Sequence, residues 1–380
     1  MIYADNAATT RISDFAFEKM LPFLREQYGN ASSRYSLGAQ AKRAIEQARR
    51  QVADAIGADI SEIVFTSGGS EGNSWALQSV LTLFKAEPTH IITSSIEHHS
   101  VLDACHALED RGIFVSYLPV DSNGCVSTNA VESAVCPDTK LVSVMLANNE
   151  IGTIQPVLEI GKLLREKSIL FHTDAVQAVG HIPVNVKDMQ VDFLTTSAHK
   201  FNGAKGTGFM YVRSGLNLPQ FVFGGGQEQG QRAGTENVAG IVAAGYAIEE
   251  SVATMRTTSE YLKLLVSATV AGIKDRIPNV RVYGATDKHL PGILNLGFDG
   301  VSGEALMHLL DVKGICVSTS SACTVGKDEP SHVLMALGLT EKQAKSAIRI
   351  SYGRYNTIDE VEVIVSAICA ACGKIREATQ

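Results

Sequence analysis

Short apolar segments recur through the middle of the chain, separated by longer stretches in which apolar residues return at helical spacing. The short segments are rich in β-branched and aromatic residues, which is typical of buried strands. We therefore expect strands at residues 90–95, 113–118, 140–146, 169–174, 191–196 and 207–212.

Helical patterns lie between most of these strands. Residues 98–112 form one, and residues 156–168 form another that opens with Pro156, where a missing N–H costs least. This alternation predicts an α/β fold with a mostly parallel sheet covered on both faces. Ligands of such sheets bind beyond the carboxyl ends of the strands, so polar residues at those points are the candidates for chemistry.

The pattern changes near residue 235. A long helical pattern covers residues 235–277, and shorter segments follow at 292–298, 302–314 and 346–351. The change predicts a second, smaller α/β domain that is reached along a connecting helix. A chain of 380 residues also exceeds the size at which single cores usually stop growing.

Composition and charge limit the classes of function that the protein can have. The chain has 33 basic and 40 acidic residues, so it offers no basic field for a nucleic acid. We see no run of about 18 apolar residues and no signal peptide, so we expect neither a membrane span nor export. The seven cysteines are then best explained as thiols, and we expect a cytoplasmic protein that acts on a small molecule.

The loop TSGGSEGN at residues 66–73 follows an apolar strand pattern and precedes a helical one. Its glycines, followed by Ser70 and Glu71 at a helix start, offer free N–H groups and a hydroxyl that suit a phosphate. A capped helix after a tight turn explains the same residues.

Asp174 ends one strand pattern, and His199 and Lys200 end a later one. Each has an ordinary alternative, a turn cap for Asp174 and a solvated side chain for Lys200. Together they meet the needs of pyridoxal phosphate, which requires a lysine amine, a carboxylate for the pyridine nitrogen and a phosphate cup.

Cys323 lies between small residues in the polar stretch 318–334. Structural cysteines usually lie in apolar segments, as Cys105 and Cys316 do. Cys323 is therefore a candidate nucleophile, with an incidental loop cysteine as the alternative.

Arg349 lies inside the apolar segment 346–351. A buried arginine needs an anionic partner, which is either a substrate carboxylate or the carboxylate of a structural salt bridge. Cys369 and Cys372 form a lone C-x-x-C without a second pair, so we expect them to pack in the core rather than bind a metal.

These motifs resemble those of the cysteine desulfurases of the Nif/Isc type, which are class-V aminotransferase-like pyridoxal-phosphate enzymes of fold type I, the aspartate-aminotransferase-like fold. The resemblance runs almost end to end. It rests on 3-YADNAATT-10, 67-SGGSEGN-73, 97-EHHSV-101, 148-NNEIGT-153, 172-HTDAVQAVG-180, 197-SAHKFNGAKGTG-208, 224-GGGQEQGQRAGTEN-237, 321-SACT-324 and 346-SAIRISYGR-354. It implies a large cofactor-binding domain at residues 13–257, and a small domain at 1–12 and 258–380 that carries the Cys323 loop.

The resemblance implies a role for each matching residue around the cofactor ring. Lys200 would hold pyridoxal phosphate covalently, Asp174 would pair with its ring nitrogen, and Gln177 would bond its ring oxygen. His98, rather than His99, would stack on the ring and act as an acid or base; a helix cap is the alternative for either histidine.

The remaining roles concern the phosphate and the substrate. Asn149 and Arg349 would receive the substrate carboxylate. Thr235 would reach the phosphate from the neighbouring subunit of a homodimer. The other groups that would hold the phosphate are Gly69, Ser70, Ser197 and His199.

The implied reaction removes sulfur from L-cysteine and gives L-alanine and a persulfide on Cys323. A sulfur-acceptor protein would take the persulfide, in iron–sulfur cluster assembly or in thiolation of tRNA or a cofactor. A selenocysteine lyase, an aminotransferase that needs no Cys323, and a catalytically silent scaffold are the alternatives. Two departures from the family pattern, Ser320 before the SAC motif and Ala204 in the turn after Lys200, predict a stiffer loop and a tolerated turn.

Overall fold

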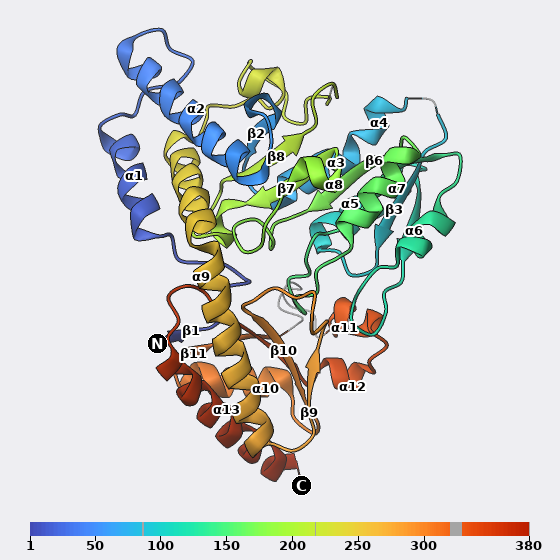
Figure 1. Ribbon diagram of the computed structural model, residues 1–380, viewed down its shortest axis with the longest axis vertical. Coiled ribbons are helices and arrows are strands. Elements are labelled where there is room, and N and C mark those ends of the chain that lie inside the picture. The colour runs from blue at the N-terminus through green and yellow to red at the C-terminus, as the bar shows by residue number, and fades with distance from the viewer. Residues whose placement is uncertain (86, 217, 320–328, 380) are drawn as a thin grey trace.

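The computed structural model of the chain describes residues 1–85, 87–216, 218–319 and 329–379. A larger part is built around a seven-stranded sheet, and a smaller part around a four-stranded sheet. Helix α9 (Val238–Arg276) runs from the larger part at the top of Figure 1 to the smaller part at the bottom.

The central sheet has the strand order β2-β8-β7-β6-β5-β3-β4. Its strands are β2 (Ile63–Thr66), β3 (His90–Ser94), β4 (Phe114–Leu118), β5 (Thr139–Ser143), β6 (Leu170–Asp174), β7 (Phe193–Ser197) and β8 (Gly208–Val212). β8 is antiparallel to β2 and β7, whereas the pairs from β7 to β4 are parallel. The mostly parallel sheet and the predicted strands are thus confirmed, and β2 adds an edge strand.

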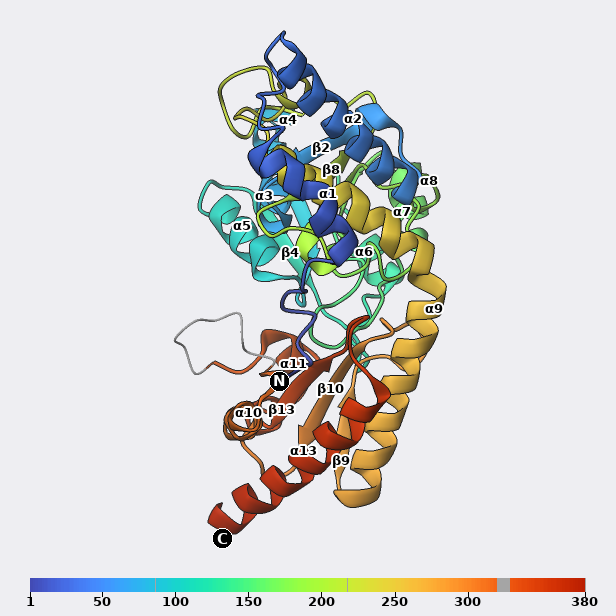
Figure 2. The same ribbon diagram turned by 90° about the vertical axis from the view of Figure 1, so that its left-hand side faces the viewer.

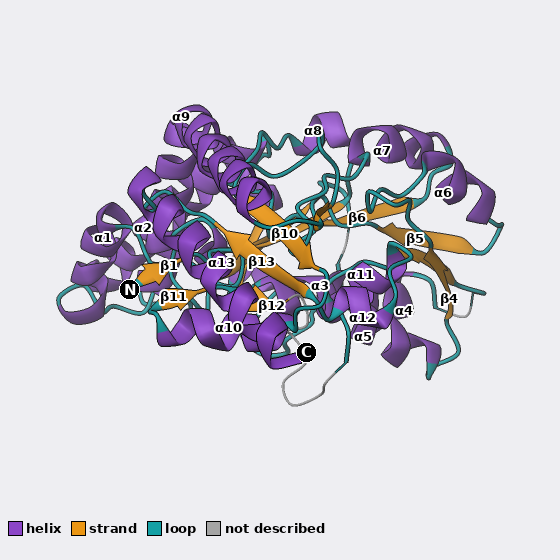
Figure 3. Ribbon diagram, turned by 90° about the horizontal axis from the view of Figure 1, so that it is seen from below, coloured by secondary structure: helices purple, strands orange, loops and turns teal. Residues whose placement is uncertain are grey.

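Helices cover both faces of this sheet (Figure 3). One side carries α3 (Gly69–Gln78), α4 (Val80–Leu83) and α5 (His99–Glu109), and the other carries α6 (Thr128–Ala134), α7 (Val157–Glu166) and α8 (Val186–Met189). Phe193 and Leu194, which are neighbours in β7, enter opposite hydrophobic clusters. This is expected because successive side chains of a strand point to opposite faces.

Helices α1 (Asp14–Arg25) and α2 (Ser36–Ile56) pack against α9. Ser13 caps α1 by accepting a bond from the Ala16 N–H, and Gly57 ends α2 with a φ of 69°. Within the described residues, α9 alone is long and apolar enough to pass for a membrane span by length and composition. However, 56% of that window is buried, as in the core helix of a folded domain.

The smaller part contains an antiparallel sheet of order β12-β13-β10-β9. Its strands are β9 (Val280–Tyr283), β10 (Ile293–Phe298), β12 (Ser318–Thr319) and β13 (Ala347–Ser351), and its helices are α10 (Gly303–Val312), α11 (His332–Ala336), α12 (Glu341–Ala344) and α13 (Ile358–Thr379). Cys372 packs in its core and Cys369 packs at the edge of that core, as predicted. The domain boundary at residue 257 stays a prediction, since α9 continues through it.

The N-terminal segment joins the two parts (Figure 2). β1 (Ile2–Tyr3) pairs with β11 (Ile315–Cys316) beside the smaller sheet. The chain then crosses to the larger part, where the Thr10 N–H donates to the His199 carbonyl at 2.9 Å. This path carries residues 5–9 past the carboxyl ends of the central strands.

Candidate active site

A cavity of about 810 Å³ lies at the carboxyl ends of the central strands. Its lining comes from the loops after β2, β3, β5, β6 and β7, from the N-terminal segment, and from β12 and β13. Ligands of α/β sheets bind at this end. The cavity brings together most of the residues singled out from the sequence, namely Gly69, Ser70, His98, Asn149, Asp174, Gln177, Ser197, His199, Lys200 and Arg349.

Two predicted residues are not part of this lining. Thr235 is exposed in the segment that precedes α9, and it does not line the cavity of its own chain. Cys323 lies outside the residues that the structure describes.

The start of α3 forms a close cradle. Gly68, with a φ of 152°, and Gly69 line the cavity together with the Ser70 hydroxyl. A Cβ added to Gly69 would lie 2.7 Å from Val176 Cγ2, so a side chain at this position would have to displace Val176. Because the first N–H groups of a helix have no partner within it, the cradle suits a phosphate.

A partly buried ion pair connects this cradle to another segment of the chain. Glu71 accepts from the Ser67 N–H at 3.0 Å. It also accepts two bonds from Arg232, from Nε at 2.9 Å and from Nη2 at 3.1 Å. Arg232 precedes Thr235, so the bidentate pair connects the phosphate cradle to the segment that carries Thr235.

Asp174 lies at the end of β6 and is 5% exposed. Its Oδ2 accepts from Asn73 Nδ2 at 2.6 Å, and its Oδ1 accepts from the Val176 N–H at 2.9 Å. These two N–H donors hold the carboxylate in one orientation. A fixed anion inside the cavity suits a cationic ring nitrogen.

A chain of hydrogen bonds connects Asp174 to His98. Asn73 Nδ2 donates to Asp174 and also to Ser100 Oγ at 2.9 Å, and Ser100 Oγ lies 2.8 Å from His98 Nδ1. The Ser100 N–H also donates to His98 Nδ1, at 3.1 Å. Since Nδ1 accepts from these donors, the proton of the neutral ring belongs on Nε2.

Burial lowers the pKa of His98, and the nearby Lys200 lowers it further, against the opposing effect of Asp174. The ring is therefore neutral near pH 7 and can accept a proton in the cavity. His98 also caps α5, so the two alternatives raised from the sequence are compatible in one residue.

Lys200 ends a short 3-10 turn after β7, η2 (Ala198–Lys200). Its Nζ donates to the carbonyl oxygens of Ala7 and Ala8, at 2.5 Å and 2.7 Å. Gln177 Nε2 donates to the same Ala7 oxygen at 3.0 Å. The amine and the amide thus meet at the N-terminal segment, on the wall of the cavity.

His199 lies beside Lys200 with its Nδ1 3.0 Å from Thr9 Oγ1. Burial lowers its pKa to about 4, and the charges of Lys200 and Lys205 add to that effect. His199 is therefore neutral at physiological pH and can donate only one ring proton.

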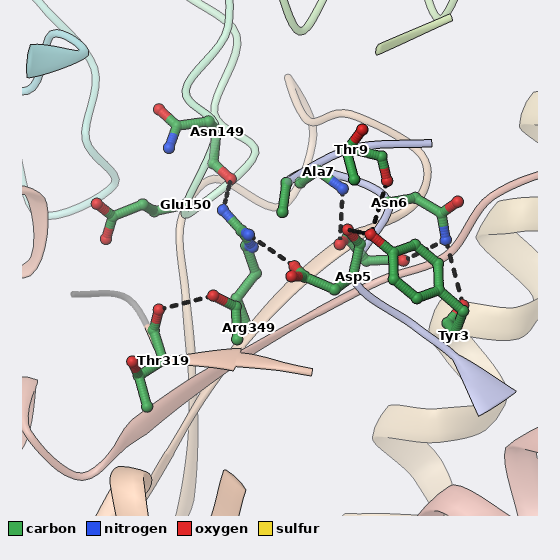
Figure 4. A network of polar contacts seen from close by, with 12 residues as sticks. Tyr3, Asp5, Asn6, Ala7, Thr9, Asn149, Glu150, Thr319 and Arg349 are labelled. Carbon is green, nitrogen blue, oxygen red and sulfur yellow. Dashed lines mark hydrogen bonds and ion pairs between the residues drawn. The ribbon is translucent and has the colours of Figure 1, made fainter. Parts of the chain in front are cut away.

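Arg349 lies on β13, where it is 5% exposed (Figure 4). Its Nη1 donates to the backbone oxygen of Asn149 at 2.9 Å, and its Nη2 donates to Asp5 Oδ1 at 2.7 Å. The Asn149 side chain points away from Arg349 in Figure 4. A structural salt bridge, one of the two alternatives for Arg349, is therefore present.

Two buried carboxyl groups flank the site. Burial raises the pKa of Glu97 to about 8 and that of Glu150 to about 7. Glu97 accepts from Ser94 Oγ at 2.6 Å, and Glu150 Oε2 accepts from Ser331 Oγ at 2.5 Å. Each carboxyl directly neighbours a cavity residue in sequence, Glu97 beside His98 and Glu150 beside Asn149.

Sequence reasoning missed Asn73, Ser100 and Asp5, which all line the cavity. Asn73 and Ser100 stand within the matched motifs, but a polar residue near a helix start looks like a cap. For Asn73 the sequence carried no signal, because Asn73 closes the polar stretch 66–73, and only the structure places it inside α3.

The site fits pyridoxal phosphate on its own chemistry. The glycine cradle at Gly69 would hold the phosphate, the buried Asp174 carboxylate suits a protonated ring nitrogen, and Lys200 supplies a primary amine in the same cavity. Among the described residues, no group of three or more metal-binding side chains occurs.

Comparisons with known proteins agree with this chemistry. The family model for class-V aminotransferases matches residues 2–364. A cysteine desulfurase IscS of Clostridium botulinum (strain Hall) is 46% identical over 369 residues, which cover 97% of this chain and 93% of the relative. A cysteine desulfurase IscS of Methanosarcina thermophila is 44% identical over 375 residues, which cover 99% and 93%.

Solved structures show the same similarity. A NifS-like protein superposes with a TM-score of 0.93 at 40% identity, covering 98% of this chain and 99% of its own. The structure titled "SspA in complex with cysteine" superposes with a TM-score of 0.83 at 36% identity, covering 94% of this chain and 100% of its own.

Proposed function

Because the chain belongs to the class-V aminotransferase family and, within it, to the cysteine desulfurases, we propose that it uses pyridoxal phosphate to take sulfur from L-cysteine. The products are L-alanine and a persulfide on Cys323. The observation that supports this most is the convergence of Lys200, Asp174 and the Gly69 cradle on one cavity. When bound, pyridoxal phosphate supplies an electron sink for the substrate carbon atoms.

Different residues would bind different parts of the cofactor and the substrate. Lys200 would hold the cofactor through its amine, Asp174 would keep the ring nitrogen protonated, and Gln177 would bond the ring oxygen. The phosphate would lie in the cradle, near Ser197 and His199. Arg349, which lines the same cavity as His98, would receive the substrate carboxylate.

His98 would move protons at the substrate, because its ring is neutral and faces the cavity. The Cys323 thiolate would attack the sulfur of the substrate. The new S–S bond forms as the Cβ–S bond breaks, and the electron pair left on the carbon fragment ends in a C–H bond of L-alanine. A sulfur-acceptor protein then takes the outer sulfur and returns Cys323 to a thiol.

A homodimer is part of the proposal. Thr235 is exposed and would complete the phosphate site of the neighbouring subunit. Phe223, in the same segment, is 84% exposed, and α1 also presents Phe17 and Leu24 to solvent. Exposed apolar side chains of this size support a contact with a second subunit. The described cysteines are free, which suits the expected cytoplasmic location.

Two substitutions test the cofactor part of the proposal. Lys200→Ala should abolish the visible absorbance band of the cofactor-loaded protein, since no amine remains to hold the cofactor. Lys205→Ala is the matched control, because Lys205 also lines the cavity, and it should keep the band. A band that survives in Lys200→Ala would exclude Lys200 as the attachment point.

A second pair tests the sulfur step. Cys323→Ser should keep the band and stop the release of L-alanine and sulfide in the presence of a reductant. Cys136→Ser, which removes an exposed thiol elsewhere, should turn over normally. Full turnover by Cys323→Ser would support an aminotransferase or another activity of this fold instead.

A further inference from the structure

The carboxylate of Asp5 is already paired with the guanidinium of Arg349. Asp5 Oδ1 lies 2.7 Å from Nη2, and both residues line the cavity (Figure 4). The pair is mostly buried, with 6% of the Arg349 side chain and 18% of the Asp5 side chain exposed. A bond of this length between two charged groups is a strong, specific contact.

Both terminal nitrogens of the guanidinium already have a partner in the protein. Nη1 is used by the Asn149 carbonyl, and Nε is buried without a hydrogen-bond partner among the described residues. The Nη2 end is therefore where a carboxylate from the cavity can bind, and Asp5 stands there. A ligand carboxylate at Nη2 would come within a few ångströms of the Asp5 carboxylate, and like charges at that distance repel.

We propose that Asp5 is a built-in competitor for the substrate carboxylate. The substrate displaces Asp5 from Arg349, and Asp5, which is partly exposed, turns into the solvated cavity. This inference rests on the proposed role of Arg349 as the substrate-carboxylate receptor. The N-terminal segment thereby lowers the affinity of the site for its substrate, because each amino acid that binds must first displace the Asp5 carboxylate.

Propionate is a suitable probe, because it carries a carboxylate but neither the thiol nor the amine of cysteine. Propionamide is its uncharged analogue of similar shape. Melting temperatures of the cofactor-loaded protein in a concentration series of each compound give dissociation constants without turnover. The variant Asp5→Asn keeps the size of the side chain and an oxygen acceptor for Nη2, but removes the competing charge.

In Asp5→Asn, the dissociation constant for propionate should fall about threefold to tenfold, because a neutral amide is displaced more easily than a carboxylate. Binding of propionamide should not change. KM for L-cysteine should fall in the same direction as the propionate constant. Asp299→Asn, which removes the carboxylate of an exposed pair with Arg281, should match the wild type in each measurement.

Unchanged or weaker propionate binding in Asp5→Asn would overturn the proposal, since a residue that merely orients Arg349 has that effect. If Asp5→Asn does not fold alone, refolding in propionate but not in propionamide would support it, and failure in both would overturn it. These outcomes are separate from the proposed function, which fails if the wild type releases no sulfide from L-cysteine.

Discussion

Glu97 is a buried carboxyl group whose titration should be visible in the stability of the whole protein. It is fully enclosed, and it accepts from Ser94 Oγ and from the Met145 N–H at 2.9 Å. Burial raises its pKa from 4.5 to about 8, although these two hydrogen bonds act in the opposite direction. The folded protein therefore keeps a proton that the unfolded chain loses above pH 4.5.

The sign and size of the effect follow from this difference. Because the folded pKa is raised, the contribution of Glu97 is complete below pH 4.5 and is lost as the pH rises to about 8. Each pH unit in that window removes about 1.4 kcal/mol, so the step from pH 5.5 to pH 8 removes about 3 kcal/mol. The free energy of unfolding of a domain is about 5–15 kcal/mol, so the loss is large.

Glu97→Gln should remove this dependence, because glutamine has nearly the same shape and does not titrate. Roughly 1 °C of melting temperature corresponds to 1 kcal/mol for a chain of this length. The wild type should therefore lose about 3 °C relative to Glu97→Gln between pH 5.5 and pH 8. Glu87→Gln, which changes an exposed carboxylate paired with Lys140, should follow the wild type at every pH. A difference that stays constant with pH would refute a buried, protonated Glu97.

Two further substitutions test the framework of the site. Glu228→Gln should lower the free energy of unfolding by about 3 kcal/mol or more, because the buried Arg49 guanidinium loses its buried carboxylate partner, which accepts at 2.7 Å and 2.9 Å. Urea unfolding measures this change. Gly69→Ala should weaken binding of pyridoxal phosphate at least tenfold in a fluorescence titration, because the new Cβ would press on Val176 at 2.7 Å, whereas Gly373→Ala meets nothing within 4 Å and should bind normally.

The pattern of apolar residues was sufficient to predict the central sheet, because its buried strands are short apolar segments between helical ones. It did not show that β8 returns antiparallel between β2 and β7. That direction is set by a short connection after Lys200 in which Asn202 and Gly206 adopt positive φ, at 65° and 71°. Strand direction depends on such turns and not on the period of apolar residues.

The sequence likewise predicts some residues of the candidate site and not others. Residues that end a strand, such as Asp174 and Lys200, are recognisable because strand ends share one edge of the sheet. Asn73 is different, because its partners Asp174 and Ser100 lie 101 and 27 residues further along the chain. Only the fold brings these three together, so no local pattern identifies Asn73 as the residue that orients both an acid and, through Ser100, a histidine.

The N-terminal segment contacts residues that lie far apart in the sequence. Asp5 meets Arg349 across 344 residues, and Ala7 meets Lys200 across 193. The segment is anchored at one end beside the smaller sheet, through β1, and at the other beside η2. Arg349 and Lys200, two cationic residues of the cavity, are thus contacted by one strip of chain that spans both parts of the molecule. Any movement of the smaller part relative to the larger one must therefore change the contacts of Arg349 and Lys200 together, which couples carboxylate recognition to the position of the lysine amine.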